Sequence, residues 1–568
     1  MNTLFHRTTA PDATLYTLHR HAPLWRRADG PAGMAWAALL ALAYACWLFS
    51  PLFLRGHGPF WLQENADVTQ YIAGFNAYVR DAWHWPLLRI TTLNAPEGTM
   101  ATFTDAIPLY ALLLKLIQHG PDTPMRNPYG LWVALCFLLQ GVGAWWICRE
   151  ARVRSWVTLT ALALLLASFP ALTFRISHTS LMSQWLLLFA IAIYLRSSRL
   201  GTLAAKPWLI LVPCAFYINV YLFAMLSAIF AADVLRHTGR EDRRPLGVLA
   251  GAYALLVLTM CVTMLPMGPG GGAYEWGFGY YSMNLLAPIN GGSLLKIPHP
   301  VAHDGQGEGY NYVGVAVLAV FILAWTLRSR RDPRFLRRHR ILGVMLALLT
   351  VFAVSNTAYL GAIHIYDLHL PDALTPITAT FRSSGRFFWP VGYAIIVFTV
   401  LSVHRHMRRG LAAALLAMLV LVQLVDLHDH HAQVRATINP PATPPLDTAR
   451  WDAFLGKDTR ELLFYPPFRC GTAPPSHSLL PTMLYATRRG YALSTGYIAR
   501  AHKSCEHYDD EIATRLKPGT AVVFDKAEFT DPAQIDRLLA KAPPTQCVAI
   551  DFAYLCRPAR PDQTEGKQ

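Results

Sequence analysis

The stretch GMAWAALLALAYACWLFSPLFL, residues 33–54, contains no charged side chain over its whole length. It is longer than the roughly 18–20 apolar residues that a helix needs to cross the hydrocarbon core of a bilayer. It also exceeds the apolar part of a cleaved signal peptide, and no small-residue cleavage site follows it. We therefore expect residues 1–32 to form a cytoplasmic N-terminal segment and residues 33–54 to form a retained first membrane span.

The rest of the chain repeats this apolar character. Of its 568 residues, 53% are hydrophobic and only 15% are charged, whereas about a quarter of a soluble globular chain is charged. The composition excludes a soluble enzyme, a disordered chain and a small disulfide scaffold. It predicts an α-helical polytopic membrane protein with about eleven transmembrane helices, at residues 33–54, 128–148, 155–171, 181–196, 207–219, 220–235, 246–267, 312–327, 341–359, 387–403 and 410–427.

The net charge of +15 is concentrated in short connections between the apolar runs. Arginine-rich connections of this kind are typical of the cytoplasmic side of a membrane protein. No basic patch is left over for DNA or RNA, so no nucleic-acid partner is expected. The four connections lie at residues 149–154, 236–244, 328–340 and 405–409.

Two segments are ambiguous, and the requirement that all four connections lie on one side of the membrane decides how each is interpreted. A crossing at residues 107–117 would place residues 149–154 on the wrong side, so we interpret this segment as an interfacial or re-entrant helix. Residues 207–235 have basic flanks at both ends, so this run is expected to split near Tyr217–Tyr221 into two spans.

This topology divides the chain into a transmembrane domain, residues 33–428, and an outer domain, residues 440–556. Alternating strand-like and helical runs predict an α/β fold for the outer domain, and the last residues, 557–568, read as a disordered tail. The transmembrane domain carries three long outer loops, at residues 55–127, 268–311 and 361–386.

The outer domain contains an even number of cysteines, which predicts disulfides if the domain faces an oxidising compartment. Cys547 and Cys556 flank a strand-like or hairpin run, so we prefer a Cys547–Cys556 bridge together with a Cys470–Cys505 bridge. The other connectivities stay open.

The first outer loop resembles that of a known class of enzymes. An acidic residue, Asp67, follows the first span, an aromatic-Pro element, Trp85-Pro86, lies some twenty residues on, and Asp105-Ala-Ile-Pro108 opens the interfacial helix. This order resembles the GT-C class of membrane glycosyltransferases, which take a sugar from a polyprenyl-phosphate donor at the outer face of the membrane.

The chain is still more similar to an uncharacterised family of bacterial integral membrane proteins, to which no activity is attached. This resemblance implies a multi-pass protein of the bacterial inner membrane with a periplasmic C-terminal domain. The residues that carry it are Phe103-Thr-Asp105-Ala-Ile-Pro-Leu109, Arg175-Ile-Ser-His178-Thr-Ser-Leu-Met-Ser-Gln-Trp185, Tyr281-Ser-Met-Asn284-Leu-Leu286, Glu308-Gly-Tyr-Asn-Tyr-Val-Gly314 and Phe381-Arg-Ser-Ser-Gly-Arg386.

The resemblance to GT-C enzymes implies a catalytic carboxylate in the first outer loop. An inverting transfer needs a base that takes the acceptor proton. Asp67 is our first choice, with Glu64 one turn earlier as a competing assignment, and Asp105 is the second choice, as base, metal ligand or structural cap. The structural alternative for Asp67 is an N-cap of the helix that follows it.

A phosphate donor requires positive charge at the outer surface, where arginine is scarce. The candidates are Arg175, Arg382 and Arg386, with His178 as an assisting group. Guanidinium suits phosphate because its donors form a planar, permanently charged fork. The structural alternative is that these arginines mark the membrane interface and reach to lipid head groups.

Candidate substrate-binding residues come from all the outer loops. Aromatic rings stack on sugar faces, and polar groups orient hydroxyls, but an aromatic belt at the bilayer surface would give the same pattern. The candidates are Tyr71, Trp85, Tyr281, Asn284, Glu308 and Tyr310.

No cofactor is predicted with certainty, and a divalent metal stays open. Asp426, His428, Asp429, His430 and His431 have suitable ligand types, but adjacent residues of one helix end cannot all converge. No phosphate-binding loop, dinucleotide fingerprint or H-E-x-x-H motif is present.

Together these features predict an inverting glycosyltransferase that moves a sugar from a polyprenyl-phosphate donor to an envelope glycan or a lipid acceptor. The alternative is a non-catalytic transporter, flippase or envelope-assembly protein. A transporter would carry ionisable residues at mid-membrane, whereas here the polar residues gather in the outer loops.

Overall fold

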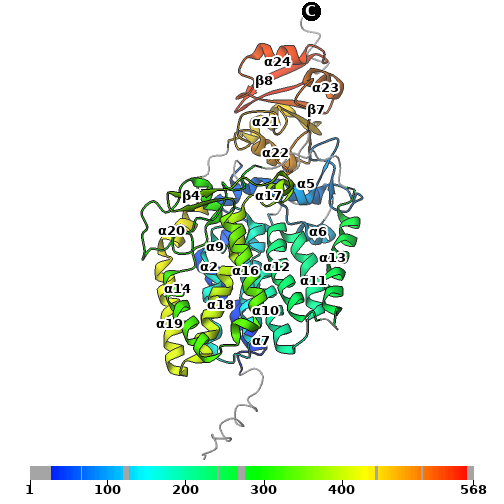
Figure 1. Ribbon diagram of the computed structural model, residues 1–568. Coiled ribbons are helices and arrows are strands. Elements are labelled where there is room, and N and C mark those ends of the chain that lie inside the picture. Colours follow the sequence, from blue (N-terminus) through cyan, green and yellow to red (C-terminus); the bar gives the residue numbers. More distant parts are fainter. Residues whose placement is uncertain are drawn as a thin grey trace, which may run out of the picture.

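The computed structural model consists of a helix bundle with a mixed α/β domain seated on one end of it (Figure 1). It describes residues 27–64, 67–118, 120, 127–239, 242–266, 276–441, 445–499 and 503–559. We call the end of the bundle that carries this domain the C-domain end. The opposite end, around residues 149–154, 328–340 and 405–409, is the arginine end.

Seven helical segments among the described residues are long and apolar enough to cross a membrane, by length and composition. Several apolar helices of this length are typical of a polytopic membrane protein. The segments are α2 (Pro31–Leu48), α7 (Tyr129–Glu150), η3 with α10 (Thr179–Leu200), α12 (Val220–His237), α13 (Arg244–Thr263), η6 with α18 (Ser384–His406) and α19 (Arg409–Asp426).

The other four predicted spans also coincide with helices, but these are shorter. Twelve to seventeen residues correspond to about 18–26 Å of helix, which is less than the hydrocarbon thickness. The number of eleven crossings therefore stays a prediction. The four helices are α8 (Trp156–Ala167), α11 (Ala205–Ile218), α14 (Val315–Arg331) and α16 (Arg340–Val354).

Both ambiguous segments adopt the expected form. The run at residues 207–235 divides at Asn219, whose side chain accepts hydrogen bonds from the backbone N–H groups of Tyr221 and Leu222 and so caps α12. The segment at 107–117 is the ten-residue helix α6 (Pro108–Ile117), about 15 Å long and too short to cross.

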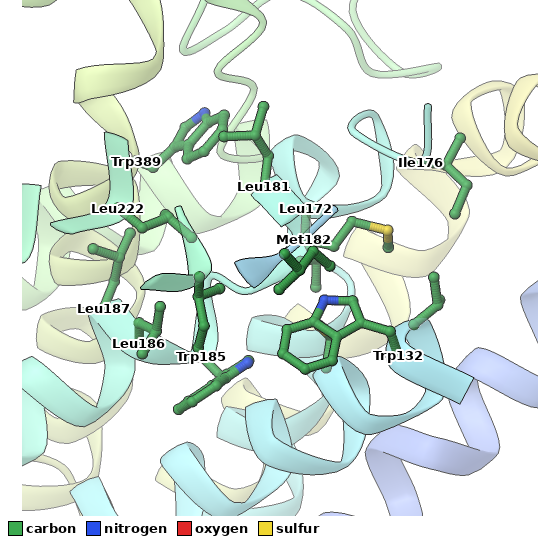
Figure 2. Packing of buried hydrophobic residues seen from close by; sticks show 14 of the residues in the cluster. Trp132, Leu172, Ile176, Leu181, Met182, Trp185, Leu186, Leu187, Leu222 and Trp389 are labelled. Atoms are coloured by element: carbon green, nitrogen blue, oxygen red, sulfur yellow. The ribbon is translucent and has the colours of Figure 1, made fainter. Parts of the chain in front are cut away.

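Inside the bundle, one turn of chain anchors several helices. Leu181 and Met182 of η3 (Thr179–Met182) lie among side chains of α7, α10, α12 and α18, including Trp132 and Trp389 (Figure 2). Short helix α9 (Pro170–Thr173) precedes this turn. The turn that leads into α10 is thus fixed by packing on several sides.

A buried polar chain reinforces this packing. The hydroxyl of Tyr393 accepts a hydrogen bond of 2.7 Å from Gln140 and donates one of 2.7 Å to Gln184. The two amides also donate to the backbone carbonyls of Leu166 and Ala171. Side-chain hydrogen bonds between helices hold membrane bundles together where hydrophobic burial cannot distinguish protein from lipid.

The outer loops form short elements at the C-domain end. The first loop contains the amphipathic helix α5 and a two-stranded ribbon of β1 and β2, and later loops contribute η4 and the hairpin β3–β4. The elements are α3 (Pro51–Leu54), α4 (Pro59–Leu62), α5 (Asp67–Arg80), β1 (Arg89–Ile90), β2 (Thr99–Met100), η2 (Ala101–Phe103), η4 (Asp304–Gly309), β3 (Thr357–Leu360), β4 (Ile363–Asp367), η5 (Asp372–Leu374), α17 (Thr375–Thr380), η6 (Ser384–Phe388) and α20 (His428–Thr437); α15 (Phe335–Arg338) lies at the arginine end.

The C-terminal domain is built on one mixed five-stranded sheet in the order β6-β5-β7-β9-β8. β5 pairs in parallel with β6 and β7, whereas β9 is antiparallel to β7 and β8. The elements are α21 (Thr448–Leu455), β5 (Glu461–Tyr465), α22 (Leu479–Arg489), β6 (Ala492–Leu493), α23 (Tyr508–Arg515), β7 (Thr520–Asp525), α24 (Pro532–Leu539), β8 (Thr545–Ile550) and β9 (Ala553–Pro558).

This domain holds the first outer loop through backbone hydrogen bonds. Leu493 of the edge strand β6 donates to the carbonyl of Thr92 and accepts from Ala95, both at 2.9 Å. The N–H of Ala499 donates to the carbonyl of Phe103 at 2.9 Å, two residues before Asp105. The domain therefore fixes the segment that carries Asp105.

The preferred disulfide pairing is confirmed. Cys470 is bridged to Cys505, and Cys547 is bridged to Cys556. The second pair occupies directly opposed positions on the antiparallel strands β8 and β9, so the strand-like run is a hairpin.

The C-terminal tail begins later in the chain than predicted. Arg557 and Pro558 belong to β9, where they pair with Gln546 and Thr545 of β8. The strand continues because the backbone of β8 still offers partners. Residues 560–568, most of the segment 1–32 and part of the 268–311 loop lie outside the described residues.

Opening the Cys470–Cys505 bridge is expected to destabilise the C-terminal domain more than opening the hairpin bridge. The two bridges close sequence separations of 35 and 9 residues, which correspond to about 4 and 3 kcal/mol of lost chain entropy in the unfolded state. Differential scanning fluorimetry of Cys470→Ser/Cys505→Ser and Cys547→Ser/Cys556→Ser measures the order, and an equal or reversed order would contradict this prediction.

Candidate functional site

Ionisable side chains from five separate segments converge at the C-domain end of the bundle. They come from the start of α5, the turn before α6, the loop between α9 and η3, and the segments η4 and η6. The strongest contacts in this cluster join Glu308 of η4 to Arg175 and Arg386.

Glu308 binds two guanidinium groups at once. Its Oε2 accepts hydrogen bonds of 2.8 Å from Arg175 and 2.9 Å from Nε of Arg386. Arg175 also donates to the backbone carbonyls of Gly307 and Glu308, both at 2.9 Å. Burial by itself would raise the pKa of Glu308, but the charges of Arg175 and Arg386 outweigh it and hold that pKa well below its ordinary value.

This arrangement defines different roles for the arginines. The Arg175 side chain is 4% exposed and turns its Nη groups to Glu308 and the backbone, so it positions η4. Arg386 is also buried, and its guanidinium lies 4.9 Å from the ring centroid of Tyr221. A triad of one carboxylate and two guanidinium groups keeps a net charge of +1, which favours an anion nearby.

Asp105 sits on a strained turn. Its φ is +54° and that of Ile107 is +51°, in the left-handed region that branched side chains avoid. Ala106 and Ile107 between Asp105 and Pro108 are completely buried. Strain of this kind, on the order of 1–3 kcal/mol per residue, persists where surrounding packing imposes it, and it is concentrated at functional sites.

Asp67 and His178 form a looser pair on the neighbouring side of the cluster. The Asp67 carboxylate lies 3.7 Å from Nε2 of His178. Asp67 is the first residue of α5, whereas Glu64 points to Arg488 of the C-terminal domain at 3.4 Å. The structure thus separates the two acidic residues that the sequence left interchangeable: Asp67 belongs to the cluster and Glu64 to the domain contact.

We call the part of the cluster around Asp105 and His178 the recess, because both side chains are accessible to solvent while protein surrounds them closely enough to desolvate them. Asp105 is exposed to solvent and the His178 side chain is 29% exposed, yet desolvation by surrounding protein is the largest influence on both. It raises the pKa of Asp105 against the opposing charges of His178, Arg386 and Arg382. It lowers the pKa of His178, with Arg386 acting in the same direction. Accessible groups in such surroundings favour a neutral imidazole and a carboxylate that binds a proton readily.

Arg382 occupies the outer rim of the same cluster. Its guanidinium lies 5.6 Å from the ring centroid of Tyr281 and donates a hydrogen bond of 3.3 Å to the carbonyl of Trp276. Its charge acts on Asp105. Arg382 is exposed on one side, so the cluster presents a guanidinium beside an aromatic ring to the solvent.

The remaining four candidates each occupy a different environment. Tyr71 is buried against the ring of Tyr129, and its hydroxyl is subject to the charges of Asp67 and Asp105. Tyr310 stacks between Phe174 and His430.

Asn284 and Trp85 have other surroundings. Asn284 is buried, and its side-chain N–H groups donate to Gln306 and to the carbonyl of Gly361. Its Oδ1 accepts from the backbone N–H groups of Leu286 and Gly361, so the side chain holds these loops together. Trp85 is 61% exposed on the segment that leads into β1, outside the cluster.

Tyr221 is a member of the cluster that sequence reasoning missed. Its hydroxyl accepts a hydrogen bond of 3.3 Å from the N–H of Ser383, and its ring packs against Arg386. The signal was available, because the split at Asn219 places the following residues at the outer end of α12.

The five residues at the end of the last span do not assemble a metal site. His430 bonds to Thr173 and His431 to Tyr44, both at 2.7 Å, whereas Asp426 accepts from Tyr312. Within the described ranges, no group of three or more His, Cys, Asp or Glu side chains is arranged to hold a metal ion.

Comparison with known families gives two matches that together cover most of the chain. A family model described as "Domain of unknown function (DUF6311)" matches residues 38–428. A second model, described as the DUF6311 C-terminal domain, matches residues 450–558. No curated protein matches the chain.

Proposed function

The chain belongs to the DUF6311 family, and from the geometry of its cluster we propose that it is an inverting, GT-C-like glycosyltransferase of the bacterial inner membrane. It moves a sugar from a polyprenyl-phosphate donor to an envelope glycan or a lipid acceptor. The supporting observation is a strained carboxylate, Asp105, in a recess where the charges of Arg382, Arg386 and His178 converge.

The reaction assigns one task to each side of the recess. The acceptor oxygen attacks the anomeric carbon while Asp105 takes the hydroxyl proton. The bond between the anomeric carbon and the phosphate oxygen breaks, and its electron pair stays on the phosphate. Arg382 stabilises the charge that develops there, since a guanidinium matches phosphate oxygens with two parallel donors.

We assign the base to Asp105 rather than to Asp67, the first choice from sequence. Desolvation by the protein around it raises the pKa of Asp105, and a general base works best when its pKa approaches the working pH. Asp67, 47% exposed beside His178, orients the acceptor in this scheme. Tyr281, next to Arg382, stacks on the sugar.

The orientation of the protein in the membrane follows from the location of its arginines and from its disulfides. The arginine end lies in the cytoplasm under the positive-inside rule, so the C-terminal domain lies in the periplasm, where its two disulfides persist. Eleven helices then cross the membrane, with the short ones α8, α11, α14 and α16 included. The C-terminal domain binds the acceptor above the recess.

Transfer from a defined donor tests the proposal. Membrane vesicles that contain the protein are given radiolabelled polyprenyl-phosphate hexoses and pentoses as probes, and label in envelope glycan or lipid is counted. Transfer that depends on the protein supports the enzyme. Movement of intact donor across the bilayer without cleavage of the sugar–phosphate bond would establish the flippase alternative instead.

Arg382→Gln is expected to raise the KM for the donor about tenfold and to change kcat less. One charge-assisted hydrogen bond to phosphate is worth about 1.5 kcal/mol, which corresponds to that factor. Arg382→Lys keeps the charge and should recover part of the loss. Arg435→Gln, an exposed arginine of α20 at the same end, is the matched control. An unchanged KM in Arg382→Gln would remove Arg382 from the donor site.

A further inference from the structure

The arginine end contains a cavity of about 100 Å³ that the proposed transferase chemistry does not use. It lies between the end of α14, the connection that follows it and α18. Its lining residues are Trp325, Arg328, Ser329, Asp332, Pro333, Phe335, Leu336 and Phe398.

The guanidinium group of Arg328 in this lining is incompletely hydrogen-bonded. Arg328 is 7% exposed, and its guanidinium lies 4.1 Å from the ring centroid of Phe335 and 3.7 Å from Asp332. Its buried Nε has no hydrogen-bond partner among the described residues. A buried guanidinium donor without an acceptor costs more than an ordinary hydrogen bond returns, so an acceptor in the cavity would be stabilising.

Positive charge exceeds negative charge around the cavity. Arg338 and Arg405 are close enough to Arg328 to disfavour its charge, and Asp332 is the carboxylate that offsets it. Nε2 of the neighbouring His406 is also buried without a partner among the described residues. Three guanidinium groups against one carboxylate leave a local excess of +2, which favours an anion.

The apolar surroundings identify what carries this anion. Trp325 and Leu336 in the wall are 39% and 46% exposed, so the cavity opens toward the surface of the bundle. Ile322, one turn above Trp325 on α14, is 65% exposed. An apolar helix face that leads into a basic pocket near the cytoplasmic interface suits a lipid whose head group is anionic.

We propose that this cavity binds the phosphate head group of an anionic phospholipid, with Arg328 in its wall as the main ligand, Arg338 as a nearby positive charge, and the acyl chains along the exposed face of α14. The site is separate from the recess at Asp105 and is independent of the transferase proposal. A phosphate ion in solution would satisfy the same donors, so the test separates the two sources.

The test adds phosphatidylglycerol, phosphatidylcholine with the same acyl chains, or inorganic phosphate to the full-length protein in nonionic detergent. Thermal unfolding is followed, and bound lipid is counted by native mass spectrometry. Phosphatidylglycerol should raise the melting temperature of the wild type and remain bound, with phosphatidylcholine less effective. Equal effects of the two lipids would overturn the proposal, and so would stabilisation by inorganic phosphate with none from phosphatidylglycerol.

Variants locate the site. Arg328→Gln and Arg338→Gln should each weaken phosphatidylglycerol binding about tenfold, as expected for one charge-assisted contact. Arg338 is exposed, so its replacement tests the site even if Arg328→Gln impairs folding. Arg337→Gln replaces an exposed neighbour in α15 whose charge, unlike that of Arg338, is not among those that act on Arg328, and it should bind as the wild type does. An equal loss in Arg337→Gln would show general surface charge and overturn the site.

Discussion

Asp105→Asn is expected to lower kcat for sugar transfer about 10²- to 10⁴-fold while the protein inserts and folds normally. This is the range over which a positioned base accelerates proton transfer. Asn keeps the size and local hydrogen bonding of Asp and tolerates a positive φ, so the turn at φ +54° can be kept. Single-turnover transfer from a polyprenyl-phosphate sugar in membrane vesicles measures the effect.

The pH profile distinguishes a base from a structural group. Desolvation by the surrounding protein raises the pKa of Asp105, so the wild type should lose activity as pH falls through that raised value, because the protonated carboxyl cannot accept a proton. The residual activity of Asp105→Asn should lack this acid limb. A variant with the wild-type limb would assign the limb, and the role of base, to another group.

Asp67→Asn is the matched comparison within the recess. If Asp67 orients the acceptor beside His178, its loss should raise the KM for the acceptor and lower kcat by a smaller factor than in Asp105→Asn. Asp304→Asn, an exposed carboxylate of η4 outside the cluster, should be neutral. A larger loss of kcat in Asp67→Asn than in Asp105→Asn would restore Asp67 as the base.

Features with a local physical cause could be predicted from the sequence. The run at residues 207–235 had to divide because both flanks are basic, and Asn219 supplies the cap at that point. The Cys547–Cys556 pairing followed from a strand-like run between two cysteines, which is the hairpin β8–β9. Helix α6 was recognised as a separate segment because a crossing there would place the arginines at residues 149–154 on the wrong side of the membrane.

Features that depend on the meeting of distant segments could not be predicted. Arg175 and Arg386 were expected to face a donor phosphate, and their shared partner is Glu308, which lies 133 and 78 positions away from them. Neither periodicity nor spacing encodes that meeting. The same holds for Glu64, whose partner Arg488 lies in the other domain.

The lengths of the spans also escaped prediction, for a physical reason. An apolar run shows how far a segment can be buried, but not where its helix ends. Ser355, the C-cap of α16, has φ +74°, and the chain then turns into β3, although the predicted span extends to residue 359. Tertiary contacts with the outer loops decide this boundary, as Met283 N–H bonding to the carbonyl of Ala353 illustrates.

Glu308→Gln is expected to destabilise the transmembrane domain by about 3–5 kcal/mol, since loss of one partner from a buried ion pair leaves the opposite charge uncompensated. Here two guanidinium groups lose the same carboxylate, and both are largely buried, at 4% and 10% side-chain exposure. Gln keeps the shape and one acceptor oxygen, so the charge alone is changed. Thermal unfolding in bilayer nanodiscs measures the loss.

The size of this effect can be assigned to the triad by matched variants and by pH. Arg175→Gln leaves the Arg386 contacts with Glu308 in place and should cost less than Glu308→Gln, while the double variant should cost less than the sum of the two. Because the folded pKa of Glu308 lies below its ordinary value, its stabilisation is complete above about pH 4.3 and is lost as pH falls further toward the folded pKa. Glu308→Gln should lack that acid-dependent loss of stability. If Glu308→Gln instead unfolds at the wild-type temperature and with the wild-type acid dependence, the carboxylate contributes nothing to the stability of the fold. The arginines would then need another anion to explain their burial, which would strengthen the assignment of this end of the bundle to a phosphate donor.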